Sequence, residues 1–212
     1  MTKKIFIWIA HPASDSLCKG LADAYQQAAN QQGAEIRIMN LADMTFDMDD
    51  FAGYNGKMSA LEPDLVAWQE NISWADHLLF VHPYWWGAMP AKAKAVLDRA
   101  LTPGFGFKYH DKGMGWDKLL KGKTADVMIT SDTPPIIDML IYRKPGRRVI
   151  KNQVLGFCGI KVKNVKQFGS VKLASANKIS GWLKHAGKMG AKAAGKQARL
   201  SSVVPTTVGE NS

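Results

Sequence analysis

Residues 82–90, HPYWWGAMP, place three adjacent aromatic side chains between two prolines. Aromatic faces stack on planar molecules, and Gly87 leaves backbone N–H groups accessible to the edge of a heterocycle. Packing in a core is the alternative role for Tyr84, Trp85 and Trp86. Three large rings in a turn that contains glycine are uncommon in pure packing, so the segment predicts a site for a flat ligand.

A second segment, residues 11–18 (HPASDSLC), has the features of an anion site. Ser16 is a good N-cap residue before a helical pattern that starts at Leu17. The start of a helix offers unpaired N–H groups and the positive end of its dipole. The chain has neither GxGxxG nor a P-loop motif, so spacing alone leaves a phosphate loop and an ordinary capped helix both open.

Other polar residues give weaker signals. The five histidines lack HExxH or cysteine-rich spacing, so no metal site is expected. His82 is interpreted as a structural histidine at the end of a strand. Asp98 and Arg99 are expected to pair or cap near the end of a helix. Ser131 and Asp132 are not accompanied by a GxSxG turn, so a serine hydrolase is not expected.

These residues must be positioned by strands and helices that alternate along the chain. Apolar runs predict strands at residues 3–10, 34–41, 77–83, 125–131 and, more weakly, 163–171. Helical spacing predicts helices at residues 17–32, 64–74, 91–101, roughly 147–158, and 174–197. Five alternations predict an α/β fold with a five-stranded parallel sheet and helices on both faces. Ligands in such sheets lie beyond the carboxyl ends of the strands, which selects residues 11–18, 82–90 and 130–146.

Length and composition limit the class of protein. With 212 residues, of which 46% are hydrophobic and 22% charged, the chain fits a single domain. We place that domain at residues 1–200, followed by a flexible tail at residues 201–212. No apolar run reaches the roughly 18 residues of a membrane span. The two cysteines form no disulfide framework, so a cytoplasmic location is expected.

The net charge of +10 is unevenly distributed. Residues 141–200 contain 15 Lys and Arg and no acidic residue, whereas residues 1–100 contain 8 against 12. Four lysines follow four-residue steps that align on one face of a helix: Lys184, Lys188, Lys192 and Lys196. The asymmetry predicts an anionic partner, or only a solvated basic face. No motif supports nucleic acid as that partner.

Residues 82–109, HPYWWGAMPAKAKAVLDRALTPGFGFKY, resemble the NAD(P)H:quinone oxidoreductases of the flavodoxin-like superfamily. The shared features are a Pro-aromatic-Trp turn, a Met-Pro-Ala helix start, an Asp-Arg pair and a Gly-Phe-aromatic-x-Tyr lid. HPASDSLCKGLADA (residues 11–24) is similar to the phosphate loop of that family, and LGFCGIKV (residues 155–162) to its last crossover. The resemblance extends over most of residues 3–170.

The resemblance implies a three-layer flavodoxin-like fold and a flavin cofactor, usually FAD, with FMN as the alternative. The phosphates would be lined by His11, Ser16, Leu17 and Cys18. The isoalloxazine ring would be cradled by Pro83, Tyr84, Trp85, Trp86 and Gly87, largely through backbone amides. Thr130 and Ser131 keep the hydroxyl groups of the loop after the fourth strand. Cys18 is then a small wall residue rather than a redox thiol.

The implied catalytic pocket for nicotinamide and quinone contains Phe107, Tyr109 and Trp86. NAD(P)H would pass hydride to flavin N5, and a quinone-like acceptor would then take it in a ping-pong reaction. Arg147 or Arg148 is expected to bind the 2′-phosphate of NADPH, because guanidinium fits phosphate in a bidentate manner.

The sequence departs from the family pattern at two places, and the resemblance also implies two kinds of partner. Gly87 stands where the family commonly has an aromatic residue, and Asp132 and Thr133 replace glycines. Relatives bind flavin at a dimer interface, which implies a homodimer. Some relatives are ancillary subunits of membrane transport systems. A regulatory flavin-binding subunit is therefore the alternative function, and the basic C-terminal region would suit contact with a membrane or a transporter.

Overall fold

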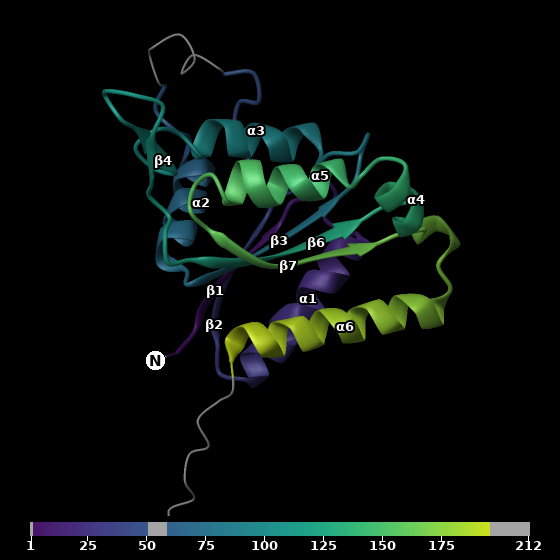
Figure 1. The fold of residues 1–212 in the computed structure, drawn as a ribbon. Coiled ribbons are helices and arrows are strands. Elements are labelled where there is room, and N and C mark those ends of the chain that lie inside the picture. The colour runs from purple at the N-terminus through teal and green to yellow at the C-terminus, as the bar shows by residue number, and fades with distance from the viewer. Residues whose placement is uncertain (1, 51–58, 196–212) are drawn as a thin grey trace, which may run out of the picture.

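The computed structural model describes residues 2–50 and 59–195. Five parallel strands form one sheet in the order β2-β1-β3-β6-β7 (Figure 1). They are β1 (Lys4–Ile9), β2 (Glu35–Asn40), β3 (His77–Pro83), β6 (Thr124–Thr130) and β7 (Lys161–Phe168). The five predicted strands and their parallel arrangement are confirmed. The predicted tail, residues 201–212, lies outside the described residues.

Helices cover both faces of the sheet (Figure 1). On one face lie α1 (Leu17–Gln31) and α6 (Ala176–Ala194). The other face carries α2 (Pro63–Trp74), α3 (Ala91–Ala100), α5 (Pro145–Arg148) and the π-helix η2 (Val149–Leu155). The helix predicted at residues 147–158 is thus observed as α5 followed by η2. A short 3-10 helix, η3 (Val171–Leu173), precedes α6.

The strands contribute side chains to two hydrophobic cores, one on each face of the sheet, because successive side chains point to opposite faces. On β3, Leu78 and Phe80 belong to the core under α2 and α3, whereas Leu79 and Val81 belong to the core under α1 and α6. This explains why the central strands read as unbroken apolar runs. In the first core, Trp8 packs edge-on against Phe80 with 5.3 Å between ring centroids.

Polar contacts confirm the structural role predicted for the end of α3. Lys94 pairs with Asp98 one helical turn away. Arg99 is buried and binds Glu62 at 2.6 Å and Asp50 at 3.2 Å. Arg99 therefore ties Asp50 and Glu62 to α3.

Besides η3, the sequence patterns missed two elements. One is an antiparallel hairpin of β4 (Phe107–Tyr109) and β5 (Trp116–Lys118), and the other is the short helix α4 (Pro135–Leu140). Three-residue strands are too short to show a hydrophobic period. The hairpin is fixed by tertiary contacts instead: the Trp116 ring stacks on Phe157 at 4.5 Å, and its indole N–H donates to the Phe157 carbonyl at 3.0 Å.

Candidate ligand site at the carboxyl edge of the sheet

The turn after β3 presents two exposed tryptophans. The Trp85 N–H donates to the Ala88 carbonyl at 2.9 Å, and the Ala88 N–H donates back at 3.1 Å. Trp86 and Gly87 both have positive φ, 53° and 76°, as in a type I′ turn. Trp85 is 47% exposed and Trp86 is fully exposed. Among the described residues no partner binds the N–H groups of Trp86 and Gly87, so two amides stay open to a ligand.

Open space surrounds Gly87. A Cβ built at this position would meet no atom within 4 Å. The glycine is therefore required by the backbone conformation and not by crowding. The space beside the turn is therefore not filled by a side chain at position 87.

Tyr84 is oriented differently from the two tryptophans. Its N–H donates to the Thr130 carbonyl at 2.7 Å, and its hydroxyl is buried without a hydrogen bond of good geometry. A Cβ on Gly146 would lie 2.4 Å from this hydroxyl. Burial and the charge of Asp138 raise the pKa of Tyr84 to about 12, partly opposed by the nearby Arg147. Tyr84 thus anchors the turn against the loop after β6, and its ring does not join the exposed surface.

The loop after β1 lies beside this turn. The His11 and Trp85 rings meet edge to face, with centroids 5.9 Å apart. Ser16 is the N-cap of α1, because its side chain accepts the Lys19 N–H at 3.3 Å. The first N–H groups of a helix have no intrahelical acceptor, so that of Leu17 points outward at the same edge. Two of the predicted loops are therefore brought together.

Cys18 is buried at the start of α1. Its Sγ lies 3.4 Å from the hydroxyl of Thr130 on β6. Burial raises the pKa of Cys18 to about 11, with only partial relief from that hydroxyl. The thiol is protonated at neutral pH and is no nucleophile. Desolvation therefore outweighs the helix dipole here, and the interpretation as a packing residue fits the structure better than a redox thiol.

The hydroxyls after β6 face inward. Ser131 donates to the Thr133 carbonyl at 3.0 Å and accepts from Gln167 at 3.1 Å. Thr130 is occupied by its contact with Cys18 and is also buried. The Thr130 hydroxyl thus contacts helix α1, and the Ser131 hydroxyl ties the loop to β7.

His82 occupies the buried end of β3. Its Nδ1 donates to the Pro83 carbonyl at 2.9 Å, while Nε2 has no partner. Burial lowers the pKa of His82 to about 4, despite that hydrogen bond. The ring is neutral at pH 7, which agrees with a structural histidine. Pro83 is itself buried, next to Thr130 of β6.

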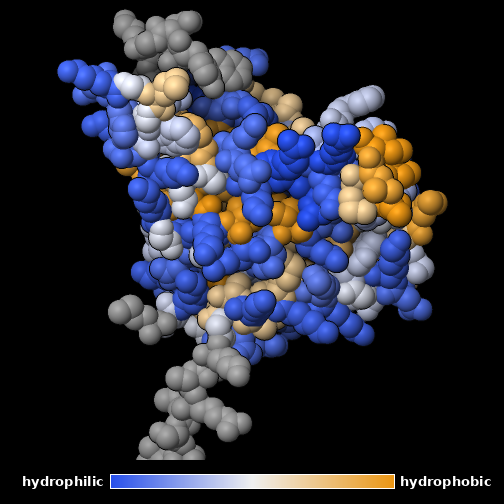
Figure 2. Space-filling view, in the orientation of Figure 1, coloured by the Kyte–Doolittle hydropathy of each residue, from blue (hydrophilic) through white to orange (hydrophobic). Residues whose placement is uncertain are grey.

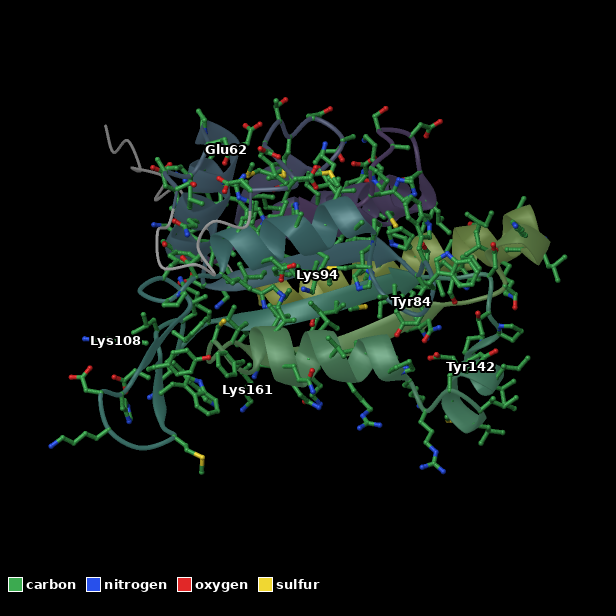
Figure 3. The ribbon with its side chains drawn as sticks, turned by 90° about the horizontal axis from the view of Figure 1, so that it is seen from above. Glu62, Tyr84, Lys94, Lys108, Tyr142 and Lys161 are labelled. Carbon is green, nitrogen blue, oxygen red and sulfur yellow. The ribbon has the colours of Figure 1, made fainter. Side chains whose placement is uncertain are left out.

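Phe107 and Tyr109 lie at the opposite edge. The hairpin follows α3 and precedes β6, so it sits at the amino ends of the strands (Figure 1). In Figure 3, Lys108 of this hairpin and Tyr84 lie at opposite ends of the molecule. Seven residues of β3 span about 20 Å. Within one chain, Phe107 and Tyr109 therefore do not approach Trp86.

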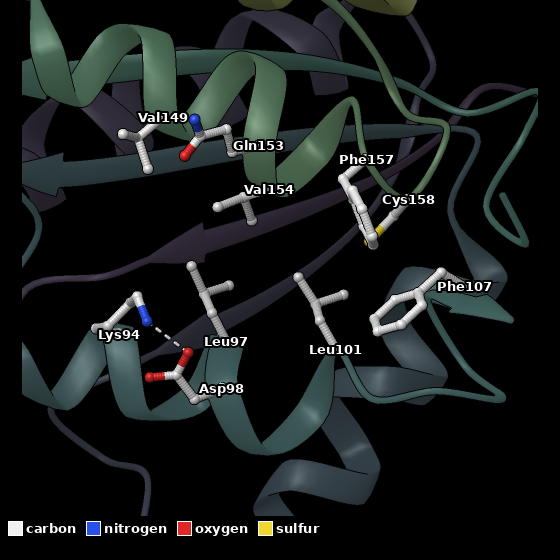
Figure 4. Close-up of a pocket in the computed structure, with 10 residues that line it drawn as sticks. All are labelled: Lys94, Leu97, Asp98, Leu101, Phe107, Val149, Gln153, Val154, Phe157 and Cys158. Carbon is white, nitrogen blue, oxygen red and sulfur yellow. Dashed lines mark hydrogen bonds and ion pairs between the residues drawn. The ribbon is translucent and has the colours of Figure 1, made fainter. Parts of the chain in front are cut away.

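An apolar cleft of about 310 Å³ runs between α3 and η2 (Figure 4). Its lining residues are Lys94, Leu97, Asp98, Leu101, Phe107, Val149, Gln153, Val154, Phe157 and Cys158. Figure 4 shows the ring of Phe107 at one end and the Lys94–Asp98 pair at the other. The cleft lies on the face between the two edges and is separate from the tryptophan turn.

The two candidate phosphate-binding arginines differ in their exposure to solvent and in their hydrogen bonds. Arg147 is partly buried and donates through Nη2 to the Val165 carbonyl at 2.8 Å. Arg148 is exposed. Asp132, which replaces a glycine of the related loop, turns outward and pairs with Lys172 at 3.5 Å. Across residues 2–50 and 59–195, no cluster of His, Cys, Asp or Glu could hold a metal ion.

The strand order and the position of the candidate site at the carboxyl edge define the fold class of the protein. Strand order reverses between β1 and β3, where doubly wound folds hold their ligands. The chain belongs to the flavodoxin-like fold family, whose model matches residues 3–188.

Curated proteins and solved structures confirm the resemblance to quinone oxidoreductases. The chain is 28% identical over 151 residues to a ribosyldihydronicotinamide dehydrogenase-like protein of Penicillium crustosum, covering 60% of this chain and 57% of that one. It is 28% identical to NAD(P)H dehydrogenase (quinone) 1 of Cavia porcellus, covering 76% and 66%. The structure of an NAD(P)H:quinone oxidoreductase from Methanothermobacter marburgensis superimposes with a TM-score of 0.73 at 23% identity, over 91% of this chain and 96% of that one. An FMN-dependent NADH-azoreductase from Bacillus anthracis superimposes with a TM-score of 0.68 at 19% identity, over 92% and 100%.

Proposed function

We propose that this chain is a flavin-dependent NAD(P)H oxidoreductase that reduces quinones or similar planar acceptors in a ping-pong reaction. One observation carries the proposal: an exposed tryptophan turn with two unpaired amides lies beside His11 and the start of α1. The curated relatives are named as NAD(P)H and ribosyldihydronicotinamide dehydrogenases, which supports the class. These names give no support to the alternative of a regulatory transport subunit.

The residues at this edge fit a flavin. The N–H groups of Leu17 and Cys18 would bind its phosphates at the positive end of α1. The unpaired amides of Trp86 and Gly87 would donate to acceptor atoms at the ring edge, and the space beside Gly87 admits that edge. FAD is the proposed cofactor and FMN, named for the Bacillus anthracis azoreductase, is the alternative.

A bound flavin would supply the hydride chemistry, while the chain orients it and excludes water. Preorganised amides in the turn would stabilise negative charge that develops on the ring. Thr130 and Ser131 would act indirectly, since their hydroxyls fix the loops around the site. Arg148, with Arg147 beside it, would bind the 2′-phosphate of NADPH. Replacing each arginine by Ala should abolish a preference for NADPH over NADH if this role is correct.

The proposal includes a homodimer. Phe107 and Tyr109 lie about 20 Å from the tryptophan turn of their own chain, so only a second copy can place them over the ring. The α3–η2 cleft opens on the face between the two edges, and Figure 2 shows apolar side chains there among charged ones. A twofold axis through this face would bring the hairpin of each copy to the turn of the other.

The test is to release the cofactor from purified protein and identify it by mass. We expect a yellow protein that NADPH reduces without oxygen. Trp85→Ala with Trp86→Ala should weaken flavin binding by at least about tenfold, since aromatic stacking contributes 0.5–1.5 kcal/mol per pair beyond area burial. Trp74→Ala, at the end of α2 where the ring contacts Lys4 and Arg37, is the matched control and should bind flavin normally. Colourless protein that no flavin reconstitutes would refute the proposal.

A further inference from the structure

Helix α4 and the residue pair after it form an apolar projection (orange near α4 in Figure 2). Six large side chains are exposed in this apolar tip: Ile136 at 59%, Ile137 at 36%, Met139 at 44%, Leu140 at 68%, Ile141 at 68% and Tyr142 at 58%. Grouped apolar side chains of this kind mark interaction sites on soluble proteins. Neither the tryptophan turn nor the flavin proposal makes use of them.

Cations follow the apolar tip directly. Arg143 and Lys144 have φ of 58° and 55°, so the chain turns sharply after Tyr142. The turn is held by the Lys144 N–H, which donates to the Asp138 carbonyl at 2.8 Å. The exposed cations in and next to it are Arg143, Arg148 and Lys172, and Lys144 is partly buried.

Negative charge near the tip is neutralised or hidden. Asp138 lies on the buried side of α4 and is 3% exposed. Asp132 is exposed but pairs with Lys172 at 3.5 Å, and it also accepts the Lys172 N–H at 3.0 Å. The surface around the apolar tip is therefore net positive.

We propose that the apolar tip docks this protein onto an anionic lipid bilayer, with its side chains at the acyl boundary and the cations against lipid phosphates. The adjacency of apolar and basic side chains is the pattern of interfacial membrane binding. It also makes lipid a better occupant than an apolar protein face, which would leave the cations without partners. Since α4 follows β6, the carboxyl edge would face the bilayer.

Two other surfaces fit lipid less well. The exposed lysines of α6, among them Lys184, Lys188 and Lys192, have no large exposed apolar side chain beside them within the described part of that helix. The β4–β5 hairpin exposes Met114, but acidic Asp111 and Asp117 flank its cations. Only α4 combines both components among these three surfaces.

The test is co-sedimentation of the full chain with phosphatidylcholine vesicles, with and without phosphatidylglycerol, at low and high salt. We expect binding that requires the anionic lipid and weakens with salt. Leu140→Asp with Ile141→Asp should lower the partition coefficient by about a hundredfold or more, because burying each side chain contributes about tenfold. Arg143→Asn with Lys144→Asn should lower it roughly 25-fold, at about fivefold per cation. Asn tolerates the left-handed backbone at both positions.

Lys112→Asn with Met114→Asp on the hairpin is the matched control and should bind as the unaltered protein does. Absence of binding to anionic vesicles would overturn the proposal. Binding that survives both α4 variants and is lost with Lys184→Ala and Lys188→Ala would assign the contact to α6 instead. A change from dimer to monomer in the Leu140 and Ile141 variant, without vesicle binding by the unaltered protein, would show that a second copy covers the tip.

Discussion

Strand β3 has a buried histidine at each end, and the two histidines differ in their hydrogen bonds. At the amino end, the His77 ring is bonded at both nitrogens, to the Tyr25 hydroxyl at 2.9 Å and to the Thr124 hydroxyl at 2.7 Å. At the carboxyl end, His82 bonds the Pro83 carbonyl through one nitrogen and leaves the other buried and unpaired. One histidine completes a network, and the other leaves a hydrogen-bonding group unused.

The same difference in hydrogen bonding is found between the amino and carboxyl edges of the sheet as a whole. At the amino edge, Asp126 accepts from Tyr25 at 3.3 Å and from Asn164 at 2.7 Å. At the carboxyl edge lie four of the seven buried, unpaired side-chain atoms found among the described residues, in His82, Tyr84, Asp138 and Gln167. The other three belong to Trp8, Glu62 and Trp68. Because an unpaired buried polar group costs about 1–3 kcal/mol, side chains at the carboxyl edge are expected to contribute less to stability than those at the amino edge.

The largest expected difference concerns pH. The pKa of His82 falls to about 4 in the fold from 6.5, so the unfolded chain binds this proton more readily. The stabilisation is complete above pH 6.5 and is lost as the pH falls toward 4, by about 3 kcal/mol in all. Urea unfolding should therefore show a shallower loss of stability between these pH values for His82→Phe than for the unaltered protein. His110→Asn on the exposed hairpin is the control; equal slopes for all three proteins would contradict the assignment.

The next effect joins the two edges across the proposed dimer. Trp86→Ala and Tyr109→Ala should each lower kcat/KM by about a hundredfold, or about 2.7 kcal/mol. In a mixed dimer of the two variants, one site receives both altered residues and the other receives neither. Co-expressed and co-purified heterodimers should therefore regain about half of the unaltered activity per dimer. No recovery would place both residues in a site built by a single chain.

Two tyrosine hydroxyls test the difference in pairing. Tyr25→Phe should cost about 1–3 kcal/mol of unfolding free energy, since the hydroxyl bonds both His77 and Asp126. Tyr84→Phe removes a buried hydroxyl whose contacts with the backbone of Gly146 and Arg147 have poor hydrogen-bond geometry, so it should cost less than Tyr25→Phe. Urea midpoints of the two variants measure the difference. Equal losses would show that the two edges are equally satisfied.

The smallest effect concerns the tryptophan turn. Gly87→Val should cost about 1–2 kcal/mol, because a branched side chain is strained at φ 76° although nothing crowds it. Gly87→Asn should cost only a few tenths, since Asn tolerates this conformation. Thermal unfolding of the two variants distinguishes strain from crowding. Equal losses would indicate that contact, and not backbone conformation, selects glycine here.

Several details of the site could not be predicted from the sequence. Trp86 and Tyr109 are close in sequence and were assigned to one pocket, yet the ten residues of α3 carry the chain about 15 Å back along the sheet between them. Tyr84 was grouped with its tryptophan neighbours but turns inward, because Gly146 leaves room for its hydroxyl. The sequence places the hydroxyls of Thr130 and Ser131 in the loop after the fourth strand, but their inward direction depends on Cys18 and Gln167 from other elements.

The sequence by itself determined the layers: unbroken apolar runs require strands covered on both faces, and helical spacing supplies the cover. It also determined the position of the turn, since Gly87 follows the tryptophan pair and Pro90 precedes the helix α3. Only the tertiary structure decided which side chains at the two edges are paired, because those partners come from strands and loops distant in the chain. The neutral state of His82, the protonated Cys18 and the exposed α4 all follow from burial, which local sequence does not encode.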